Sequence, residues 1–477
     1  MSPHSVPVTG GLRGLRALEA QRLIDLVALR LAPSVAGGLI AYSHMASIEQ
    51  GLIVFVAMFA AAQLIERSRF PLHLMPATRI LLALAAPLLG GFVAWRLADA
   101  AGNSQALGQY EAVVLGAGLV MALGAWIKAR LMDGMRARVA VIGPREFTAD
   151  LAAELAASDV QTYEIVGWLA PQGPAEYRRL RWLGGLEDVR SAVVSQRIEL
   201  LVCAPTAGDP NGDPLEEVCA HVAEECLDLP VRMIAANQLY EETLGHVPIG
   251  TIDAAWYRYI MHPNFRASSP TSKRMFDLAV GSVVAVLCLP VLAVAALAIK
   301  LGDRGPVLYR QRRIGEHGEQ FEMLKLRTMR VDAERDGAQW AAAGDERVTR
   351  AGRILRRTHL DEVPQIWNIL RGQMTLVGPR PERPEIVAEL EHKFSHYTRR
   401  QLVKPGIAGW AALRCGYAGS DLGTAWKLCH DLFYVKRRSL FGDTLILAET
   451  AVEIFRDAHR ALRTPDGRFL LEEEANG

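Results

Sequence analysis

The sequence lacks any excess of charge and any metal-type spacing of its cysteines. Lys and Arg number 53 against 52 Asp and Glu, so the formal net charge is +1. This balance does not favour nucleic acid as a partner. The six cysteines form no CxxC motif and no zinc-like spacing with histidine. We therefore expect reduced, buried thiols in a protein that faces the cytosol.

The N-terminus also lacks the small-residue cleavage site of a secretory signal peptide. Half of the residues are nevertheless apolar, which is a high share for a purely soluble protein. They gather first in four stretches, at roughly 23–43, 50–65, 80–98 and 110–128. Each stretch approaches the ~20 residues that a helix needs to cross hydrocarbon. We predict four transmembrane helices in a domain of residues 1–136, with four buried helices of a soluble bundle as the alternative.

Charges between these stretches decide against the soluble bundle and give an orientation. The loops 43–50 and 99–110 contain no Lys or Arg. Basic residues instead gather before the first stretch, between the second and third, and after the fourth: Arg13, Arg16, Arg22, Arg67, Arg69, Arg79, Lys128, Arg130, Arg136 and Arg138. The positive-inside rule then places both ends of the four-span domain in the cytoplasm. Arg96 is the single exception, and its long side chain can reach the interface.

Residues 137–235 have a different pattern, in which buried strands alternate with helices. Strands are expected near 139–143, 163–169, 198–204 and 231–234, which predicts a Rossmann-like parallel α/β sheet. A dinucleotide site would need G-x-G-x-x-G after the first strand. Only Gly143 of that motif is present, and Glu146 and Phe147 would repel or obstruct a pyrophosphate. We expect a structural or regulatory role without a cofactor. Residues 236–272 are read as a connector.

A fifth apolar run, Met275–Ile299, has basic residues on both flanks. It is long enough to span a membrane, but the positive-inside rule places both of its ends on the cytoplasmic side. Pro290 lies within the run and would bend a helix. We predict a re-entrant helix–break–helix over 275–300. The alternative, a straight span, would place all later residues outside the cytoplasm.

The C-terminal third combines an acidic pair, Asp361–Glu362, with clusters of basic residues. A strand over 320–329 would place Lys325 and Arg327 on one face. A helix would gather the arginines of 353–357, and prolines flank and stiffen the backbone at Arg380. Arginine forks suit phosphate, so we expect phosphate-ester substrates. The carboxylates could bind Mg²⁺, supply an aspartyl nucleophile, or merely cap the helix that follows.

Four motifs in this third resemble the bacterial sugar transferase family, over about Thr271–Phe455. They are KRMFDLAVGSVVAVLCLP (273–290), LDEVPQIWNIL (360–370), TLVGPRP (375–381) and VKPGIAGW (403–410). Members of the monotopic type are polyprenyl-phosphate glycosyl-1-phosphate transferases. Long members with an N-terminal membrane domain and an α/β domain initiate exopolysaccharide, capsule or O-antigen synthesis.

The resemblance implies a mostly helical catalytic domain over 273–477. This domain would transfer a sugar-1-phosphate from a UDP-sugar to undecaprenyl phosphate and release UMP. Asp361 would attack the sugar-bearing phosphate and form a phosphosugar-aspartyl intermediate, and Asp361 and Glu362 would hold Mg²⁺. Further residues would bind phosphate and neutralise developing charge: Lys325, Arg356 and Arg380. Other substrate contacts are expected from Arg327, Arg353, Gln365, Arg383 and Lys404.

The resemblance further implies the inner membrane of a bacterium, with both termini and the catalytic domain cytoplasmic. Ala408 and Ala412 stand where the family often has Thr and Gln, which leaves the sugar open; glucose or galactose is the first expectation. His359, next to the pair, is expected to point away from it. The long apolar spans permit a homodimer. Two alternatives stay open: direct attack by the lipid phosphate with Asp361 as a base, and a membrane scaffold or nucleotide-sensing regulator without catalysis.

Overall fold

The computed structural model describes residues 17–456 apart from short gaps, of which the longest are 68–75, 205–214, 261–269 and 334–344. Arg13, Arg16, Arg69 and part of the expected connector therefore lie outside the described residues. The chain divides into two compact units, Met1–Gly245 and His246–Gly477. The first unit contains a group of apolar helices and a parallel sheet, and the second contains the acidic pair.

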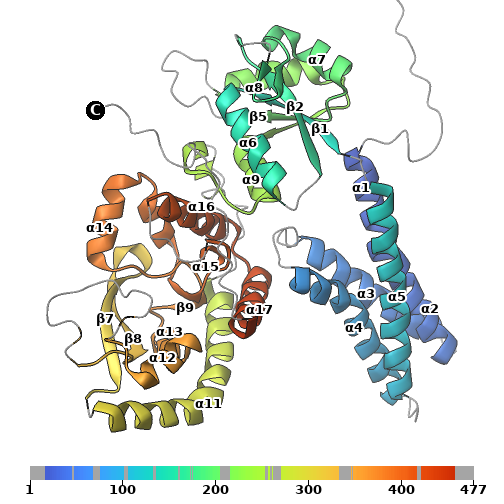
Figure 1. Cartoon of the computed structure of the whole chain (residues 1–477). Coiled ribbons are helices and arrows are strands. Elements are labelled where there is room, and N and C mark those ends of the chain that lie inside the picture. Colours follow the sequence, from blue (N-terminus) through green and yellow to red (C-terminus); the bar gives the residue numbers. More distant parts are fainter. Residues whose placement is uncertain are drawn as a thin grey trace, which may run out of the picture. The chain divides into compact units, whose positions relative to one another are not determined.

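The N-terminal apolar stretches form long helices (Figure 1). Their bounds are α1 Ala17–Leu26, a π-helical turn Val27–Leu31, α2 Ala32–Met45, α3 Ile48–Arg67, α4 Pro76–Ala100 and α5 Ala106–Met132. Among the described residues of the whole chain, three stretches are long and apolar enough to cross a membrane: Leu23–Ser43, Tyr110–Lys128 and Pro270–Gly302. Ile48–Gln63 is a shorter apolar stretch.

Glycines allow two of these helices to approach closely. A Cβ built on Gly38 of α2 would lie 2.9 Å from the backbone oxygen of Gly51 in α3. One built on Gly51 would collide with the backbone oxygen of Gly38 in the same way. Small residues at such crossings are typical of helices that pack in lipid, where dispersion contacts replace the hydrophobic effect.

A six-stranded sheet forms the second part of this unit, with strand order β3-β4-β2-β1-β5-β6. The strands are β1 Ala137–Ile142, β2 Tyr163–Leu169, β3 Glu176–Tyr177, β4 Leu180–Trp182, β5 Leu200–Cys203 and β6 Arg232–Ala235. The helices are α6 Arg145–Ala157, α7 Val189–Gln196, α8 Leu215–Cys226 and α9 Ala236–Thr243. All pairings except β3 with β4 are parallel. The predicted parallel α/β sheet is therefore present, and the short β3–β4 pair is an addition to it.

The glycine turn after β1 differs in detail from the expectation. Gly143 has φ of +143°, a conformation that favours glycine. Phe147 does not obstruct the turn, because it is buried in the core against Tyr240 of α9. Glu146 forms an ion pair with Arg145.

The second unit is built around a long apolar helix, α11 (Pro270–Asp303), which contains Pro290. Figure 1 shows that α11 is one helix bent along its length. Proline inside a helix removes a backbone hydrogen bond and so bends it. Ala295 and Ile299 in its second half pack against Leu326 and Leu355.

Two small sheets and several helices complete this unit. β7 Leu308–Ile314 and β8 Gln320–Leu326 form an antiparallel hairpin, and β9 Thr375–Val377 pairs in parallel with β10 Gly406–Ala408. The helices are α12 Arg350–Arg357, α13 Gln365–Leu370, α14 Pro384–Lys393, α15 Trp410–Cys415, α16 Asp421–Arg437 and α17 Leu440–Arg456. α11 packs against α12, α13, α17 and β9, so the membrane-type helix touches the segments that border the acidic pair.

Candidate functional site

The acidic pair lies in a single 3-10 turn, Leu360–Glu362, between α12 and α13. This turn packs against β8 and α12. His359 precedes it with φ of 54° and an exposed side chain. This left-handed conformation costs a non-glycine residue about 1 kcal/mol, and it turns the chain sharply after α12. α13 has Pro364 at its N-cap and no side-chain capping hydrogen bond, so the pair does not act as a helix cap.

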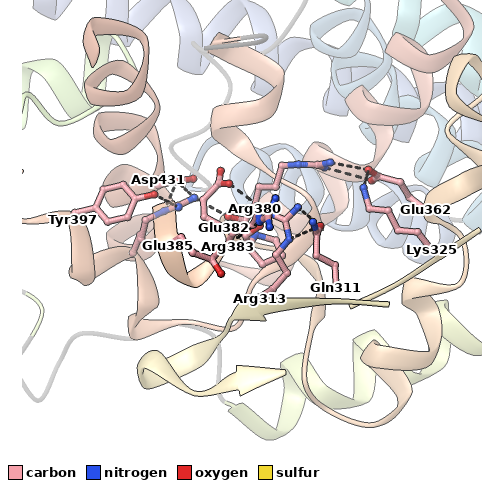
Figure 2. A network of polar contacts seen from close by, with 12 residues as sticks. Gln311, Arg313, Lys325, Glu362, Arg380, Glu382, Arg383, Glu385, Tyr397 and Asp431 are labelled. Carbon is pink, nitrogen blue, oxygen red and sulfur yellow. Dashed lines mark hydrogen bonds and ion pairs between the residues drawn. The ribbon is translucent and has the colours of Figure 1, made fainter. Parts of the chain in front are cut away.

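The Glu362 carboxylate is held between two cations (Figure 2). Lys325 Nζ donates to its Oε1 at 2.9 Å, and Arg380 donates to the same oxygen at 2.7 Å. Burial alone would raise the pKa of Glu362, but the charges of Arg380 and Lys325 outweigh burial and hold this pKa well below its usual range. Burial in turn lowers the pKa of Lys325. Glu362 is therefore a permanent anion that orients both cations.

Asp361 has the opposite environment, although it is the adjacent residue. It is 9% exposed, and no side chain in the described part of the chain forms a hydrogen bond or an ion pair with its carboxylate. Burial, followed by the negative charge of Glu362, raises the pKa of Asp361. A poorly solvated carboxylate without a partner is a better nucleophile than one engaged in ion pairs. The two adjacent carboxylates thus differ in environment: Glu362 is fixed between two cations, and Asp361 is buried without such a contact among the described residues.

Lys325 reaches the pair because β8 is held from both sides. Across the hairpin it lies opposite Tyr309. On the other edge of β8, the amide of Asn368 takes the place of a missing strand. It donates to Glu322 O at 2.7 Å and accepts from Leu324 N at 3.1 Å. Asn368 lies on α13, directly after the acidic pair, so one helix fixes both the pair and the strand that carries Lys325.

Arg380 lies in a loop whose backbone is fixed at several points. The carbonyl of Pro379 accepts from Gly406 N at 2.9 Å. The carbonyl of Arg380 itself accepts from the Arg400 guanidinium at 2.8 Å. Arg400 is buried and paired with Asp431 of α16 at 2.7 Å. The Arg380 side chain remains 49% exposed, so a rigid backbone presents a guanidinium that solvent and ligands can reach.

A second, partly buried arginine holds the far side of this loop. The guanidinium of Arg313 in β7 donates to the side-chain oxygen of Gln311 at 2.6 Å, which orients it. It also donates to the carbonyl of Pro381 at 3.0 Å. The backbone of Ile314 donates to the carbonyl of Glu382 at 3.0 Å. Figure 2 shows Arg313 bound to Gln311 at the hairpin, and Arg380 and Lys325 bound to Glu362. The hairpin therefore positions both Lys325 and Arg380.

The remaining candidate residues lie at different distances from the pair. Arg356 donates to the Thr328 hydroxyl at 2.9 Å, and its charge is among those that act on Asp361. Gln365 is buried at the start of α13. Arg327 follows β8 and is buried, whereas Arg353 is exposed on α12.

Two further candidates lie near other features of the unit. Arg383 lies at the N-cap of α14, 3.5 Å from Glu385. The ammonium of Lys404 lies beside Gly372, at the end of α13.

The carboxylates of the acidic pair could supply some, but not all, of the ligands of a Mg²⁺ ion. The described residues contain no group of three or more His, Cys, Asp or Glu side chains that could hold a metal. Mg²⁺ commonly takes one or two carboxylates and completes its shell with substrate phosphates and water. Asp361 and the less engaged oxygen of Glu362, which lies 3.4 Å from Arg380, fit that mode of binding.

The sequence alone did not indicate three residues that shape the site: Asn368, Arg313 and Arg400. Asn368 had a signal, because it is a polar residue among the apolar positions of QIWNIL and it proves to be buried. Arg313 and Arg400 had none, since charged residues near them are frequent and their roles depend on tertiary contacts.

Comparison with known proteins finds relatives for the second unit of the chain. Residues 268–457 match the family model described as bacterial sugar transferase. The chain is 40% identical over 178 residues to the UDP-N-acetylgalactosamine-undecaprenyl-phosphate N-acetylgalactosaminephosphotransferase of Aeromonas hydrophila, covering 37% of this chain and 42% of that protein. It is 43% identical over 178 residues to the UDP-glucose:undecaprenyl-phosphate glucose-1-phosphate transferase of Xanthomonas campestris pv. campestris, covering 36% of this chain and 37% of the relative.

A third relative is matched over most of its length. The UDP-glucose:undecaprenyl-phosphate glucose-1-phosphate transferase of Caulobacter vibrioides is 38% identical over 187 residues, which cover 39% of this chain and 70% of that protein. The chain thus matches less than half of the first two relatives but more than two thirds of the third.

Proposed function

Because the chain belongs to the bacterial sugar transferase family, we propose that it transfers a sugar-1-phosphate from a UDP-sugar to undecaprenyl phosphate. The products are UMP and undecaprenyl-diphosphate-sugar, in the first membrane step of exopolysaccharide, capsule or O-antigen synthesis. The relatives act on UDP-glucose or on UDP-N-acetylgalactosamine by name. For this chain we propose glucose or galactose as the sugar.

The observation that carries this proposal is the contrast between the two adjacent carboxylates. Asp361 is buried and has no hydrogen-bond or ion-pair partner among the described residues, while Glu362 is fixed between Lys325 and Arg380. In the first step, an Asp361 oxygen attacks the sugar-bearing phosphorus. The bond from that phosphorus to the bridging oxygen breaks, and the oxygen leaves with UMP. In the second step, an oxygen of the lipid phosphate attacks the same phosphorus and displaces the Asp361 carboxylate.

The surrounding cations are suited to the charge that these steps develop. Arg380 is half exposed on a fixed loop, so its guanidinium can bind non-bridging phosphate oxygens in both steps. Lys325 lies deeper and can neutralise the leaving oxygen. Preorganised donors of this kind commonly contribute the largest share of transition-state stabilisation.

We also propose that Mg²⁺ takes part, held by Asp361 and Glu362 together with diphosphate oxygens. When bound, the ion would neutralise the diphosphate and improve UMP as a leaving group. Treatment with EDTA should then abolish UMP release, and added Mg²⁺ should restore it. Full activity in EDTA would contradict a metal requirement without bearing on the nucleophile.

The primary test is UMP release by the purified full chain, with undecaprenyl phosphate and a panel of UDP-sugars that includes UDP-glucose, UDP-galactose and UDP-N-acetylgalactosamine. We expect one or two of these donors to release UMP at rates well above the others. Asp361→Asn should abolish release while the protein stays in the membrane. Retained cellular function in Asp361→Asn would instead favour a scaffold or sensing role.

The covalent route is tested separately from the overall reaction. Incubation with a UDP-sugar labelled in the sugar, without lipid, should place hydroxylamine-labile label on the protein. No label and no exchange between UMP and UDP-sugar would favour direct attack by the lipid phosphate, with Asp361 as a base.

We further propose that α11 enters and leaves the membrane on its cytoplasmic face, and that the four N-terminal helices span the inner membrane with both ends in the cytoplasm. The bend of α11, the presence of Pro290 within it and the basic residues at both of its ends support this topology. Cysteines introduced at Ser272 and Asp303, after replacement of the native ones, should react with an impermeant reagent from the same side. Labelling from opposite sides would refute the re-entrant geometry.

A further inference from the structure

The first turns of α11 hold two other segments of the catalytic unit through polar contacts that are buried or partly buried. We call residues 273–277 the anchor turns. Arg274 donates through its two terminal nitrogens to the carbonyls of Ile369 and Leu370, the second at 2.7 Å. These carbonyls belong to the last turn of α13, where helix carbonyls lack intrahelical partners. The guanidinium therefore fixes the end of the helix that begins directly after the acidic pair.

Asp277 makes the second connection, to β9. It is 3% exposed, and its Oδ2 accepts from the Thr375 hydroxyl at 2.7 Å. Its Oδ1 accepts from Leu376 N at 3.2 Å. β9 leads directly into the loop that carries Arg380, so Asp277 fixes the strand from which that arginine is presented.

A further ion pair locks the anchor turns themselves. Lys273 Nζ lies 3.1 Å from Asp277 Oδ1 and 2.7 Å from Asp443 Oδ2 in α17. Asp443 is 1% exposed, and the Tyr434 hydroxyl of α16 lies 2.9 Å from its Oδ1. Buried ion pairs and hydrogen bonds of this kind restrain the elements that they join.

We propose that Arg274 and Asp277 are positioning residues, through which the membrane helix sets the distance between Asp361 and Arg380. Arg274 acts on the acidic pair through α13, and Asp277 acts on Arg380 through β9. Neither side chain forms a contact with Asp361, Glu362 or Arg380 in the described structure. The catalytic geometry then depends on the position of α11 in the membrane. Membrane attachment and catalysis are therefore coupled through the anchor turns.

This inference rests on the proposed transfer reaction, because it assigns the anchor turns a role in the rate of that reaction. Displacement of a catalytic group by about 1 Å can lower a rate about 100-fold without loss of binding. Loosening of the anchor turns should therefore lower kcat more than it raises the KM for the UDP-sugar.

The test uses the full chain in nanodiscs and three substitutions outside the catalytic residues. Arg274→Met removes the donors and keeps the aliphatic stem. Arg274→Lys keeps one cationic donor group for the same carbonyls. Thr375→Val removes one donor to Asp277 and is the milder change. Lys300→Met is the control, since Lys300 lies at the other end of the same helix and donates only to Gly305 O among the described residues.

We expect Arg274→Met to lower kcat by about 10–100-fold and Thr375→Val by about threefold to tenfold, with the donor KM changed less than about threefold. Arg274→Lys should recover part of the loss, and Lys300→Met should match the wild type. Hydrogen exchange of the amides in 360–380 should accelerate in Arg274→Met and Thr375→Val but not in the control.

Two outcomes would overturn the proposal. One is a kcat within about twofold of wild type in both Arg274→Met and Thr375→Val. The other is unchanged hydrogen exchange over 360–380 in Thr375→Val, which keeps the fold even if Arg274→Met does not. Hydrogen exchange needs no substrate. If the wild type releases UMP from no UDP-sugar, the proposed function fails, and the exchange data still decide whether the anchor turns order the site.

Discussion

Replacement of the carboxylate by an amide should change the stability of the fold in opposite directions at the adjacent residues Asp361 and Glu362. Asp361→Asn and Glu362→Gln each replace one carboxylate by an amide of nearly equal size. Both should abolish UMP release, the first through loss of the proposed nucleophile and the second through loss of the anion that orients Lys325 and Arg380. Their effects on the free energy of unfolding should differ in sign.

Glu362→Gln removes the common partner of two cations. The Lys325 and Glu362 side chains are 18% and 13% exposed, so the lysine would be left unpaired in a poorly solvated place. Removal of one partner of a buried pair typically costs about 3–5 kcal/mol. Since Arg380 is 49% exposed and can turn to solvent, we take the lower limit of about 3 kcal/mol. For a unit of this size, that corresponds to a fall in Tm of about 6–12 °C.

Asp361→Asn should raise the Tm at neutral pH. The folded protein holds the pKa of Asp361 above its usual value of about 3.9, so the ionised carboxylate opposes folding once the pH exceeds that raised pKa. Between the two pKa values the folded state binds more protons than the unfolded state, and stability falls as the pH rises. The advantage of Asn should therefore vanish below about pH 4, where Asp361 is protonated in both states.

Thermal unfolding of the two variants in one detergent, followed by fluorescence at pH 7.5 and pH 4, checks both signs. A Tm for Asp361→Asn that falls as far as that of Glu362→Gln would refute this division of the pair into a destabilising nucleophile and a stabilising anion. Equal pH dependence of the two variants would refute it as well.

Two other substitutions test the supports of the site and the acid response of the unit. Asn368→Leu should lower the transfer rate by about 10–100-fold, because Leu324 N and Glu322 O of β8 lose their partner; UMP release within about twofold of wild type would contradict this role for the amide. Asp345, held by Arg347, has its pKa lowered to about 2, so its contribution to stability is complete above about pH 4 and is lost as the pH falls towards 2. Asp345→Asn should accordingly lower the Tm at pH 7 but leave it unchanged at pH 2, as thermal scans at both values would show.

The periodicity of the sequence predicted the parts of the fold in which each element buries a continuous apolar run. Val139–Ile142 and its neighbours read as buried strands, and the structure confirms a parallel sheet there. The short β3–β4 pair was missed, since two or three residues give no periodic signal. The strand expected over 320–329 ends at Leu326, so Arg327 does not continue the face that Lys325 occupies.

For the site, the sequence indicated the charged residues but not how their charges are divided. The motifs placed Asp361, Glu362, Lys325 and Arg380 together, and three of the four are in direct contact. Which carboxylate pairs with the cations depends on the direction of two side chains in one 3-10 turn, and no local pattern encodes that direction. The anchoring by Arg400 depends on a carbonyl 20 residues away, which sequence spacing does not reveal.

The amide of Asn368 also affects how the protein avoids aggregation while it folds. The β7–β8 hairpin can form by itself from local contacts, and the edge of β8 would then offer unpaired backbone groups to any other strand. Asn368 covers two of these groups across 44 and 46 residues of chain, and the loop that it closes contains the acidic pair. During synthesis, the edge of β8 therefore keeps unpaired backbone groups, which can pair with other strands, until α13 packs against it. Variants at Asn368 should be prone to misassembly during synthesis as well as slow in catalysis.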